Sequence, residues 1–330
     1  MIRHIKDETN RYFHQWWRGK EAEAARTGAD VPDKRTKAEW VDTTDAEIKA
    51  FIAVMIVIGN NKRPRFKYYW SLEWLIDMVG YGSTVMRRDR FMVILRFLHV
   101  ADNTRAIPRG NPGHDRCFKI RPMLRILVPQ WQAVFFIDKC TSIDEGMIGF
   151  KGRVYMRQYM PKKPTKWGLK AWILAGSKTG FVYKWQLYTG KEGDQVEVNL
   201  GQRVVLELSQ ILLRGHEVYC DKFFTCYELL ETLQGRGIAC CGTVRSNRVS
   251  NPQEQKDFTV KRQGKANLQR LSPIFKRCGD ILAVSWYDKR PVTKLSRNHT
   301  SEMVTKRLRD REAEGGYRRI EKPQAVVQYN

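Results

Sequence analysis

Two short runs of strand-forming residues each lead to an aspartate: TSIDE at residues 141–145 and EVYCDKFF at residues 217–224. In both runs β-branched or apolar side chains precede the carboxylate, so we expect Asp144 and Asp221 to emerge where a β-strand ends. Two carboxylates on neighbouring strands can hold a divalent metal ion against a phosphodiester. The pair predicts a metal-dependent site for phosphoryl transfer. The alternative is that both are ordinary surface acids at strand ends.

The segments around these runs predict an α/β core over residues 139–246. After the Asp144 strand we expect strands at 167–175 and 181–188, a helix at 203–213, the Asp221 strand, a helix at 225–234 and a strand at 238–244. Three antiparallel strands followed by alternating helices and strands are typical of a ribonuclease-H-like α/β fold.

The first 138 residues predict an all-helical domain. Thr44 and Glu47 have the spacing of a capping box, which predicts that a helix begins there and runs through residues 48–58. Apolar residues at helical spacing predict further helices at 86–99 and 118–136, and Pro129 is expected to kink or break the latter.

Beyond the core the sequence predicts a small β-rich insertion at 247–319, with strand-like pieces at 281–286 and 292–295. The charged stretch 306–322 is expected to be a solvated loop. Residues 320–330 are expected to return to the core, with a strand at 325–329. A sheet-forming segment at the very end of the chain predicts that the core is truncated there.

The charge balance favours a polyanionic partner. The 330 residues include 59 Lys and Arg against 35 Asp and Glu, a net charge of +24, and neutralising phosphates with such cations releases counterions. A ribosome-like, membrane-surface or simply basic soluble protein is the alternative. The longest apolar run, residues 50–58, is too short to span a bilayer. We therefore expect a soluble, intracellular protein with no membrane association.

The seven cysteines form no CxxC pair and no Cys/His cluster with zinc spacing. We expect free thiols and no zinc site. A hard ion such as Mg²⁺ or Mn²⁺, which prefers carboxylate oxygens, suits the aspartates better. Asp144 would bridge two ions and Asp221 would hold one of them, whereas Glu145 should point to the opposite side of its strand and have a structural role.

A basic loop, YMPKKPTKWGLK at residues 159–170, lies between the two aspartates. Lys162, Lys163 and Lys166 are candidates for phosphate contacts, and Trp167 could stack on a DNA end or an unpaired base. The alternative is an exposed basic loop with Trp167 buried as the first residue of a strand. Arg245, just after the predicted strand at 238–244, supplies a further cation.

These segments together resemble the piggyBac transposase family. The resemblance covers nearly the whole chain and rests on an ordered set of motifs: RDRF at 88–91, LHVADN at 98–103, SIDE at 142–145, KGR at 151–153, YMPKKPTKWG at 159–168, CDKFFT at 220–225 and GTVRSN at 242–247.

The resemblance implies a cut-and-paste DNA transposase in the nucleus. It implies a ribonuclease-H-like core, a helical domain for dimerisation and DNA binding, Mg²⁺-dependent chemistry with three aspartates, hairpin ends and TTAA targets in double-stranded DNA. Asp144 and Asp221 match the first two catalytic aspartates. The third lies in a Gly-Gly-Val-Asp element after a segment resembling residues 323–330, and the chain ends before that element.

Four readings of the chain follow from this mismatch. We expect a transposase-derived DNA-binding protein with impaired strand cleavage. The others are a fragment of a complete active transposase, a non-catalytic DNA-binding or chromatin-associated protein, and a nuclease that recruits Asp288 as the third acid.

Overall fold

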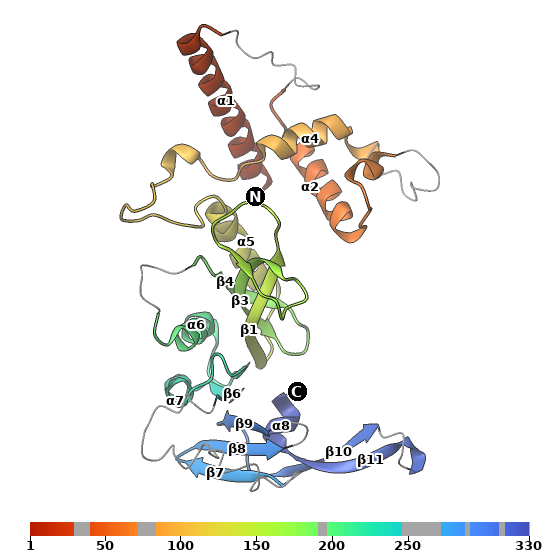
Figure 1. The fold of residues 1–330 in the computed structure, drawn as a ribbon, viewed down its shortest axis with the longest axis vertical. Helices are drawn as coiled ribbons and strands as arrows, with labels where there is room; N and C mark the ends of the chain where they lie inside the picture. Colours follow the sequence, from red (N-terminus) through yellow and green to blue (C-terminus); the bar gives the residue numbers. More distant parts are fainter. Residues whose placement is uncertain are drawn as a thin grey trace. The chain divides into compact units, whose positions relative to one another are not determined.

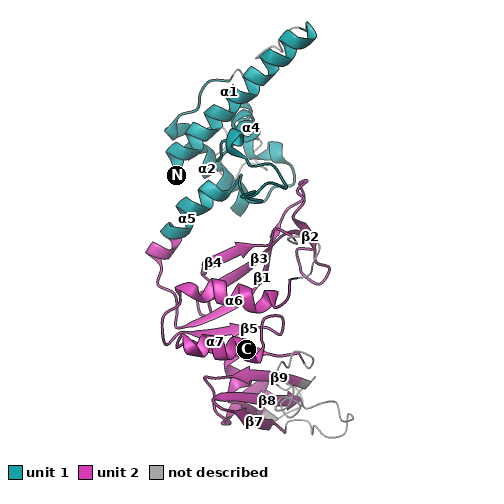
Figure 2. Ribbon diagram, turned by 90° about the vertical axis from the view of Figure 1, so that its left-hand side faces the viewer, with its two compact units in different colours: residues 1–130 teal, residues 131–330 magenta. Residues whose placement is uncertain are grey.

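The computed structural model describes residues 1–29, 40–71, 84–190, 197–245, 272–287, 291–309 and 314–329. The chain divides into two compact units, residues 1–130 and 131–330 (Figure 2). Within the described residues, no helix is both long enough and apolar enough to cross a membrane.

The first unit is helical, as predicted. Its elements are α1 (Ile2–Thr27), α2 (Asp45–Asn60), η1 (Phe66–Trp70), α4 (Arg88–Phe97), η2 (Asn103–Arg105) and most of α5 (Arg121–Val134). The predicted capping box is confirmed, because the backbone N–H of Glu47 donates to Oγ1 of Thr44 and that of Thr44 donates to Oε2 of Glu47, both at 3.2 Å. Pro129 does not end its helix, which continues to Val134. Proline removes a single backbone donor, and the flanking turns keep theirs.

The second unit contains a mixed sheet with strand order β2-β3-β1-β5-β6-β9-β8-β7, and β4 pairs with β3 (Figure 1). The strands are β1 (Cys140–Gly149), β2 (Arg157–Tyr159), β3 (Trp167–Gly176), β4 (Val182–Leu187), β5 (Glu217–Cys220), β6 (Ala239–Thr243), β7 (Ile274–Cys278), β8 (Ile281–Tyr287) and β9 (Pro291–Ser296). β1 runs antiparallel to β3 and parallel to β5, which in turn runs parallel to β6. The predicted order of strands and helices is confirmed.

The core of this unit lies between the sheet and the helices α6 (Leu200–Leu208), continued by η3 (Ser209–Ile211), and α7 (Tyr227–Gly235). α6 contacts β3 and β4, and α7 contacts β6 (Figure 2). Trp172 of β3, Leu208 of α6 and Leu230 of α7 are almost completely buried there. Burying such apolar side chains is the main source of stability for this layer.

The sheet does not end at β6. The predicted strand pieces at 281–286 and 292–295 are confirmed as parts of β8 and β9, and β9 pairs antiparallel with β6. The predicted solvated loop at 306–322 is wrong, because β10 (Met303–Arg309) and β11 (Tyr317–Pro323) form an antiparallel pair, with η4 (Glu314–Gly316) just before β11. Of the residues in this pair, only Ile320 and Pro323 are buried. The strands therefore lack the apolar alternation by which a half-buried strand is recognised.

The predicted strand at 325–329 is also wrong. Residues Gln324–Tyr329 form the helix α8, in which Ala325 packs against Leu282 and Val284 of β8. A short apolar run is compatible with either a buried strand or a buried helix. The ladder ends at Pro323, and the N–H of Gln324 donates to the carbonyl of Glu302 at 2.9 Å.

Candidate active site

Asp144 and Asp221 occupy adjacent positions on neighbouring strands. In the parallel pairing of β1 with β5, Ile143 lies opposite Cys220, and each aspartate is the next residue in its chain. Neighbouring strands lie about 4.8 Å apart, and equivalent positions in parallel strands face the same side. The structure therefore brings the two predicted carboxylates side by side on one sheet.

Only one of the two aspartates follows a strand end. Asp221 comes directly after β5, whereas Asp144 lies in the middle of β1, which continues to Gly149. The prediction that Asp144 ends its strand is wrong because β1 stays paired with β3 up to Gly149, opposite Gly168. The pairing of β1 with β5 nevertheless ends at Ile143, so Asp144 lies one residue beyond it, and its side chain is exposed.

The turn after β5 holds Asp221 firmly. Its Oδ1 accepts a hydrogen bond from the N–H of Phe223 at 2.7 Å, and its carbonyl accepts one from Oγ1 of Thr225 at 2.9 Å. The hydroxyl of Tyr329 in α8 donates to the carbonyl of Cys220 at 3.2 Å. The hydrogen bonds from Thr225 and Tyr329 were not predicted. No pattern within 220–225 points to residue 329, and Thr225 looks like an ordinary helix-start residue.

The electrostatics of Asp144 reflect its neighbours. Partial burial raises its pKa above the ordinary value, and the nearby charges of Asp221 and Glu145 add to the rise. The N–H of Glu145, which donates to Oδ1 of Asp144 at 2.7 Å, and the ammonium group of Lys163 oppose it. A divalent cation beside the two carboxylates would relieve their repulsion.

The donor set partly fits a hard divalent ion. Within the described residues no group bonds to Oδ2 of Asp144 or of Asp221, so two carboxylate oxygens remain for a metal, with further positions for water and phosphate. The described residues contain no group of three or more His, Cys, Asp or Glu side chains that could hold a metal ion. Asp288, the third acid of the alternative nuclease reading, lies outside the described residues.

Glu145 is the centre of a small ion-pair network. Its carboxylate lies 3.0 Å from the Nζ of Lys170 and 3.5 Å from that of Lys163, which also donates to the carbonyl of Glu145 at 3.1 Å. Burial raises the pKa of Glu145, but the two lysines outweigh it and the net pKa is lowered. Lys163 is thereby tied to β1 beside Asp144.

The other predicted cations are solvent-exposed. Lys162 and Lys166 lie on the loop between β2 and β3, and both side chains are exposed. Arg245 is exposed two residues beyond β6, and the pairing of Cys220 with Gly242 brings this strand end to the level of Asp221. Trp167 is the first residue of β3 but is 49% exposed, so the alternative that it is buried is wrong.

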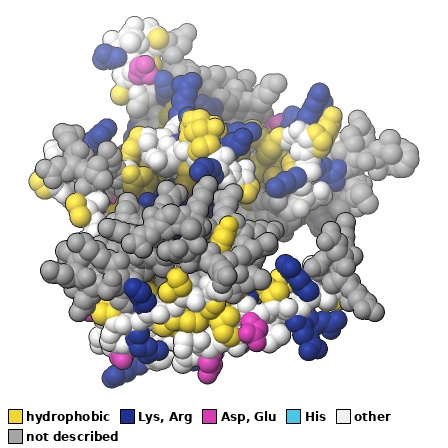
Figure 3. Space-filling model, turned by 60° about the horizontal axis from the view of Figure 1, so that its bottom comes forward, with side chains coloured by type: hydrophobic (Ala, Val, Ile, Leu, Met, Phe, Trp, Pro, Cys, Tyr) yellow, Lys and Arg dark blue, Asp and Glu magenta, His cyan; other side chains and the backbone are white. Residues whose placement is uncertain are grey.

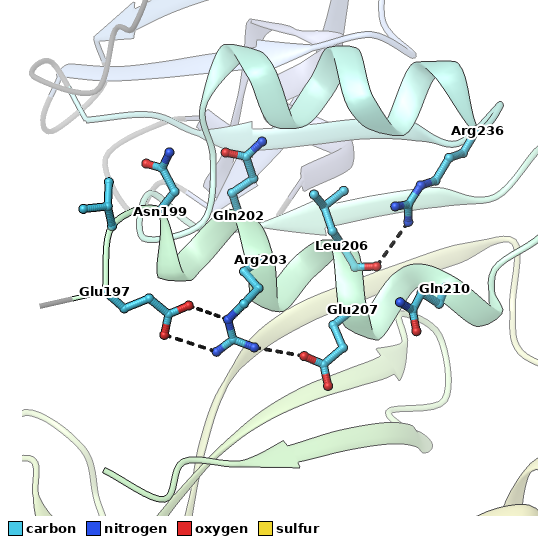
Figure 4. Close-up of a pocket in the computed structure, with 9 residues that line it drawn as sticks. Glu197, Asn199, Gln202, Arg203, Leu206, Glu207, Gln210 and Arg236 are labelled. Atoms are coloured by element: carbon cyan, nitrogen blue, oxygen red, sulfur yellow. Dashed lines mark hydrogen bonds and ion pairs between the residues drawn. The ribbon is translucent and has the colours of Figure 1, made fainter. Parts of the chain in front are cut away.

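Away from the aspartates, a hollow of about 670 Å³ lies along α6 (Figure 4). The guanidinium of Arg203 forms ion pairs with Glu197 and Glu207, and Arg236 donates to the carbonyl of Leu206 at 3.2 Å. These charges satisfy one another, so we assign no ligand to this hollow. On the molecular face in Figure 3, Lys and Arg side chains are spread among apolar ones, while Asp and Glu are sparse.

Comparison with known proteins identifies a matching family and several relatives. A family model described as "Transposase IS4" matches residues 1–330. Human piggyBac transposable element-derived protein 3 is 29% identical over 234 residues, which cover 69% of this chain and 38% of that protein. Human piggyBac transposable element-derived protein 2 is 26% identical over 257 residues, with 75% and 38% covered. The chain thus spans about two fifths of these relatives.

The fold has a counterpart of known structure. The whole chain superposes on 62% of a chain from the cryo-EM structure of a piggyBac transposase synaptic complex with hairpin DNA, with a TM-score of 0.76 and 25% identity. The predicted ribonuclease-H-like α/β fold with an N-terminal helical region is confirmed by this match.

Proposed function

Because the chain belongs to the piggyBac family of DDE transposases and is a transposase-derived protein, we propose that it binds double-stranded DNA and carries a weakened form of the family's phosphoryl-transfer site. Transposases of the DDE type use divalent metal ions. The observation that carries the proposal is the adjacent placement of Asp144 on β1 and Asp221 directly after β5.

Asp144 and Asp221 would hold Mg²⁺ or Mn²⁺ through their free Oδ2 atoms. Such an ion supplies electrostatic stabilisation to the reacting phosphodiester. The protein's own contribution is to orient the two carboxylates through the turn after β5 and through Lys163, which lies beside Asp144. With two carboxylates in place of three, affinity and geometry both suffer, so strand cleavage by this chain alone should be weak or absent.

The cations around the site would contact DNA phosphates. Lys162, Lys166 and Arg245 are exposed and can pair with phosphate oxygens. Lys163 has three N–H donors and can contact a phosphate while it remains bound to Glu145. A TTAA target, a homodimer and nuclear residence are further proposals, supported by the family and by the net charge of +24.

A non-catalytic DNA-binding or chromatin-associated protein is the second candidate. It is favoured by the finding that the described residues contain no group of three or more His, Cys, Asp or Glu side chains that could hold a metal ion. In that case Asp144 and Asp221 would be relics of a transposase site.

Mn²⁺ titration followed by electron paramagnetic resonance separates these candidates. If the site is retained, Asp144→Asn and Asp221→Asn should each weaken Mn²⁺ binding at least tenfold, while salt-dependent binding to a DNA duplex persists. Asp280→Asn is the matched control, because Asp280 is an exposed aspartate of the same unit that contacts Arg297 and Gln234.

Two results would contradict parts of this proposal, the first the retained site and the second its impairment. Equal Mn²⁺ affinity in the wild type and all three variants would favour the non-catalytic protein. Robust metal-dependent cleavage of a hairpin or duplex end that Asp144→Asn abolishes would show that two carboxylates suffice, and would refute the expected impairment.

A further inference from the structure

An open groove of about 780 Å³ lies beside the outer end of β1 and the loop that leads to β3. Its lining includes Phe150, Lys151, Arg157, Lys166 and Trp167, and none of its lining residues, all of which are described, is acidic. The volume falls in the range of about 300–1,000 Å³ that is usual for ligand sites. Three cations without a carboxylate favour an anionic ligand and disfavour a cationic one.

Trp167 presents a stacking surface at this groove. It is 49% exposed, and the cross-strand neighbour Tyr159 is 52% exposed. Their ring centroids lie 4.6 Å apart with planes tilted by 36°, and the guanidinium of Arg157 lies 4.9 Å from the centre of the Trp167 ring. Large aromatic rings left in solvent beside cations are unusual for a purely structural cluster.

The backbone around Trp167 is tightly constrained. A Cβ added at Gly168 would lie 2.2 Å from the carbonyl oxygen of Ile148, so β1 and β3 approach closely beside Trp167 because residue 168 is glycine. Arg157 donates to the carbonyls of Lys151 and Gly152 at 3.2 and 3.3 Å. Rigid strands and a tethered guanidinium pre-organise the groove, which lowers the entropy lost on binding.

We infer that this groove binds an unpaired nucleobase of DNA, stacked on Trp167, with the adjoining phosphates on Lys151 and Lys166. The inference rests on the proposed function, because it concerns DNA held at the same site. Aromatic side chains flanked by cations are the usual platform for unpaired bases, and every base has a π-face. Stacking on an aromatic ring does not depend on base identity, so the site should tolerate all four bases.

The test uses two DNA duplexes of equal length and charge. One carries a single extrahelical 2-aminopurine, and in the other the same 2-aminopurine is paired. The wild-type chain should bind the first duplex roughly 5- to 150-fold more tightly, the range expected for stacking one base on one aromatic side chain. The fluorescence of the unpaired 2-aminopurine should fall on binding.

Variants assign the effect to Trp167. Trp167→Ala should abolish the preference and leave the affinity for the paired duplex unchanged, whereas Trp167→Phe should keep part of the preference. Tyr317→Ala is the matched control, because Tyr317 of β11 is 48% exposed and has Arg307 4.5 Å from its ring centre, yet does not line the groove. This variant should behave as the wild type.

Each failure has a distinct meaning. Equal affinity of the wild type for both duplexes would overturn the stacking site and leave DNA binding intact. A loss of affinity for both duplexes in Trp167→Ala and in Trp167→Phe would show that Trp167 has only a structural role. Tighter binding of the same unpaired base in RNA would overturn the assignment to DNA. No binding of either duplex would overturn the proposed function itself.

Discussion

Gly242 of β6 offers the sharpest test of how the site is held. A Cβ at this position would lie 2.1 Å from Oγ1 of Thr225 and 2.6 Å from the carbonyl oxygen of Cys220. Both atoms belong to the segment that fixes Asp221, since the Thr225 hydroxyl bonds to the Asp221 carbonyl at 2.9 Å. Gly242→Ala should therefore displace the turn that carries the carboxylate, although position 242 is not itself a proposed ligand.

The expected cost follows from these two contacts. Both are shorter than 3.0 Å, one of them involves a backbone atom, and Thr225 is completely buried. Overpacking of this kind typically costs about 1–3 kcal/mol, and we expect about 2–3 kcal/mol for Gly242→Ala. For a folding unit of this size that loss lowers the melting temperature by roughly 4–12 °C. The affinity for Mn²⁺ should fall with it.

Calorimetric unfolding and Mn²⁺ titration provide the assay, with Gly235→Ala as the control. A Cβ at Gly235, the last residue of α7, has no neighbouring atom within 4 Å, so that variant should be neutral or more stable by up to about 1 kcal/mol. In a double-mutant cycle, Thr225→Ala should soften the effect of Gly242→Ala by removing the nearer clash. A Gly242→Ala variant as stable as the wild type, with unchanged Mn²⁺ affinity, would refute the reasoning.

Two further predictions concern charge. Lys294 is 2% exposed, and burial lowers its pKa to about 8 from the usual 10.5; because the folded-state pKa is the lower one, stability should rise as the pH increases from about 8 to 10.5. At pH 7, Lys294→Met should raise the free energy of unfolding by up to about 3 kcal/mol. Urea denaturation at pH 7 and pH 10 checks this. The gain should be smaller at pH 10, and an equal effect at both pH values would contradict the reasoning. The variants Lys162→Ala, Lys166→Ala and Arg245→Ala should each remove one phosphate contact. For duplex DNA, each should therefore reduce the slope of log affinity against log salt concentration by about 0.9. Unchanged slopes in all three variants would exclude these contacts.

Local sequence patterns were sufficient to predict most of the secondary structure. The capping box at Thr44 and Glu47, the apolar spacing of the helices and the strand runs that lead to Asp144 and Asp221 are all short-range signals. They predict secondary structure because the buried face of a helix or strand requires apolar residues at the repeat of that element, about 3.6 residues for a helix and two for a strand. The excess of cations likewise predicted a polyanionic partner from composition alone.

The two wrong predictions of secondary structure near the end of the chain have a common cause. The strand pair β10–β11 buries almost nothing apolar, and the apolar run at 325–329 could be buried either as strand or as helix. In both cases the outcome depends on partners far along the chain. For α8 those partners are Leu282 and Val284 of β8, which no local pattern around residue 325 reveals.

The amino-acid sequence by itself determined most of the helices and strands, the positions of the two aspartates in the chain and the net positive charge. The tertiary structure alone decided that Asp144 lies in mid-strand beside Asp221, that Glu145 ties Lys163 to β1, that Tyr329 supports the end of β5 and that Trp167 stays exposed at a basic groove. Backbone propensity and hydrophobic periodicity act over a few residues, whereas register, ion pairs and exposure depend on which distant segments the packed sheet brings together.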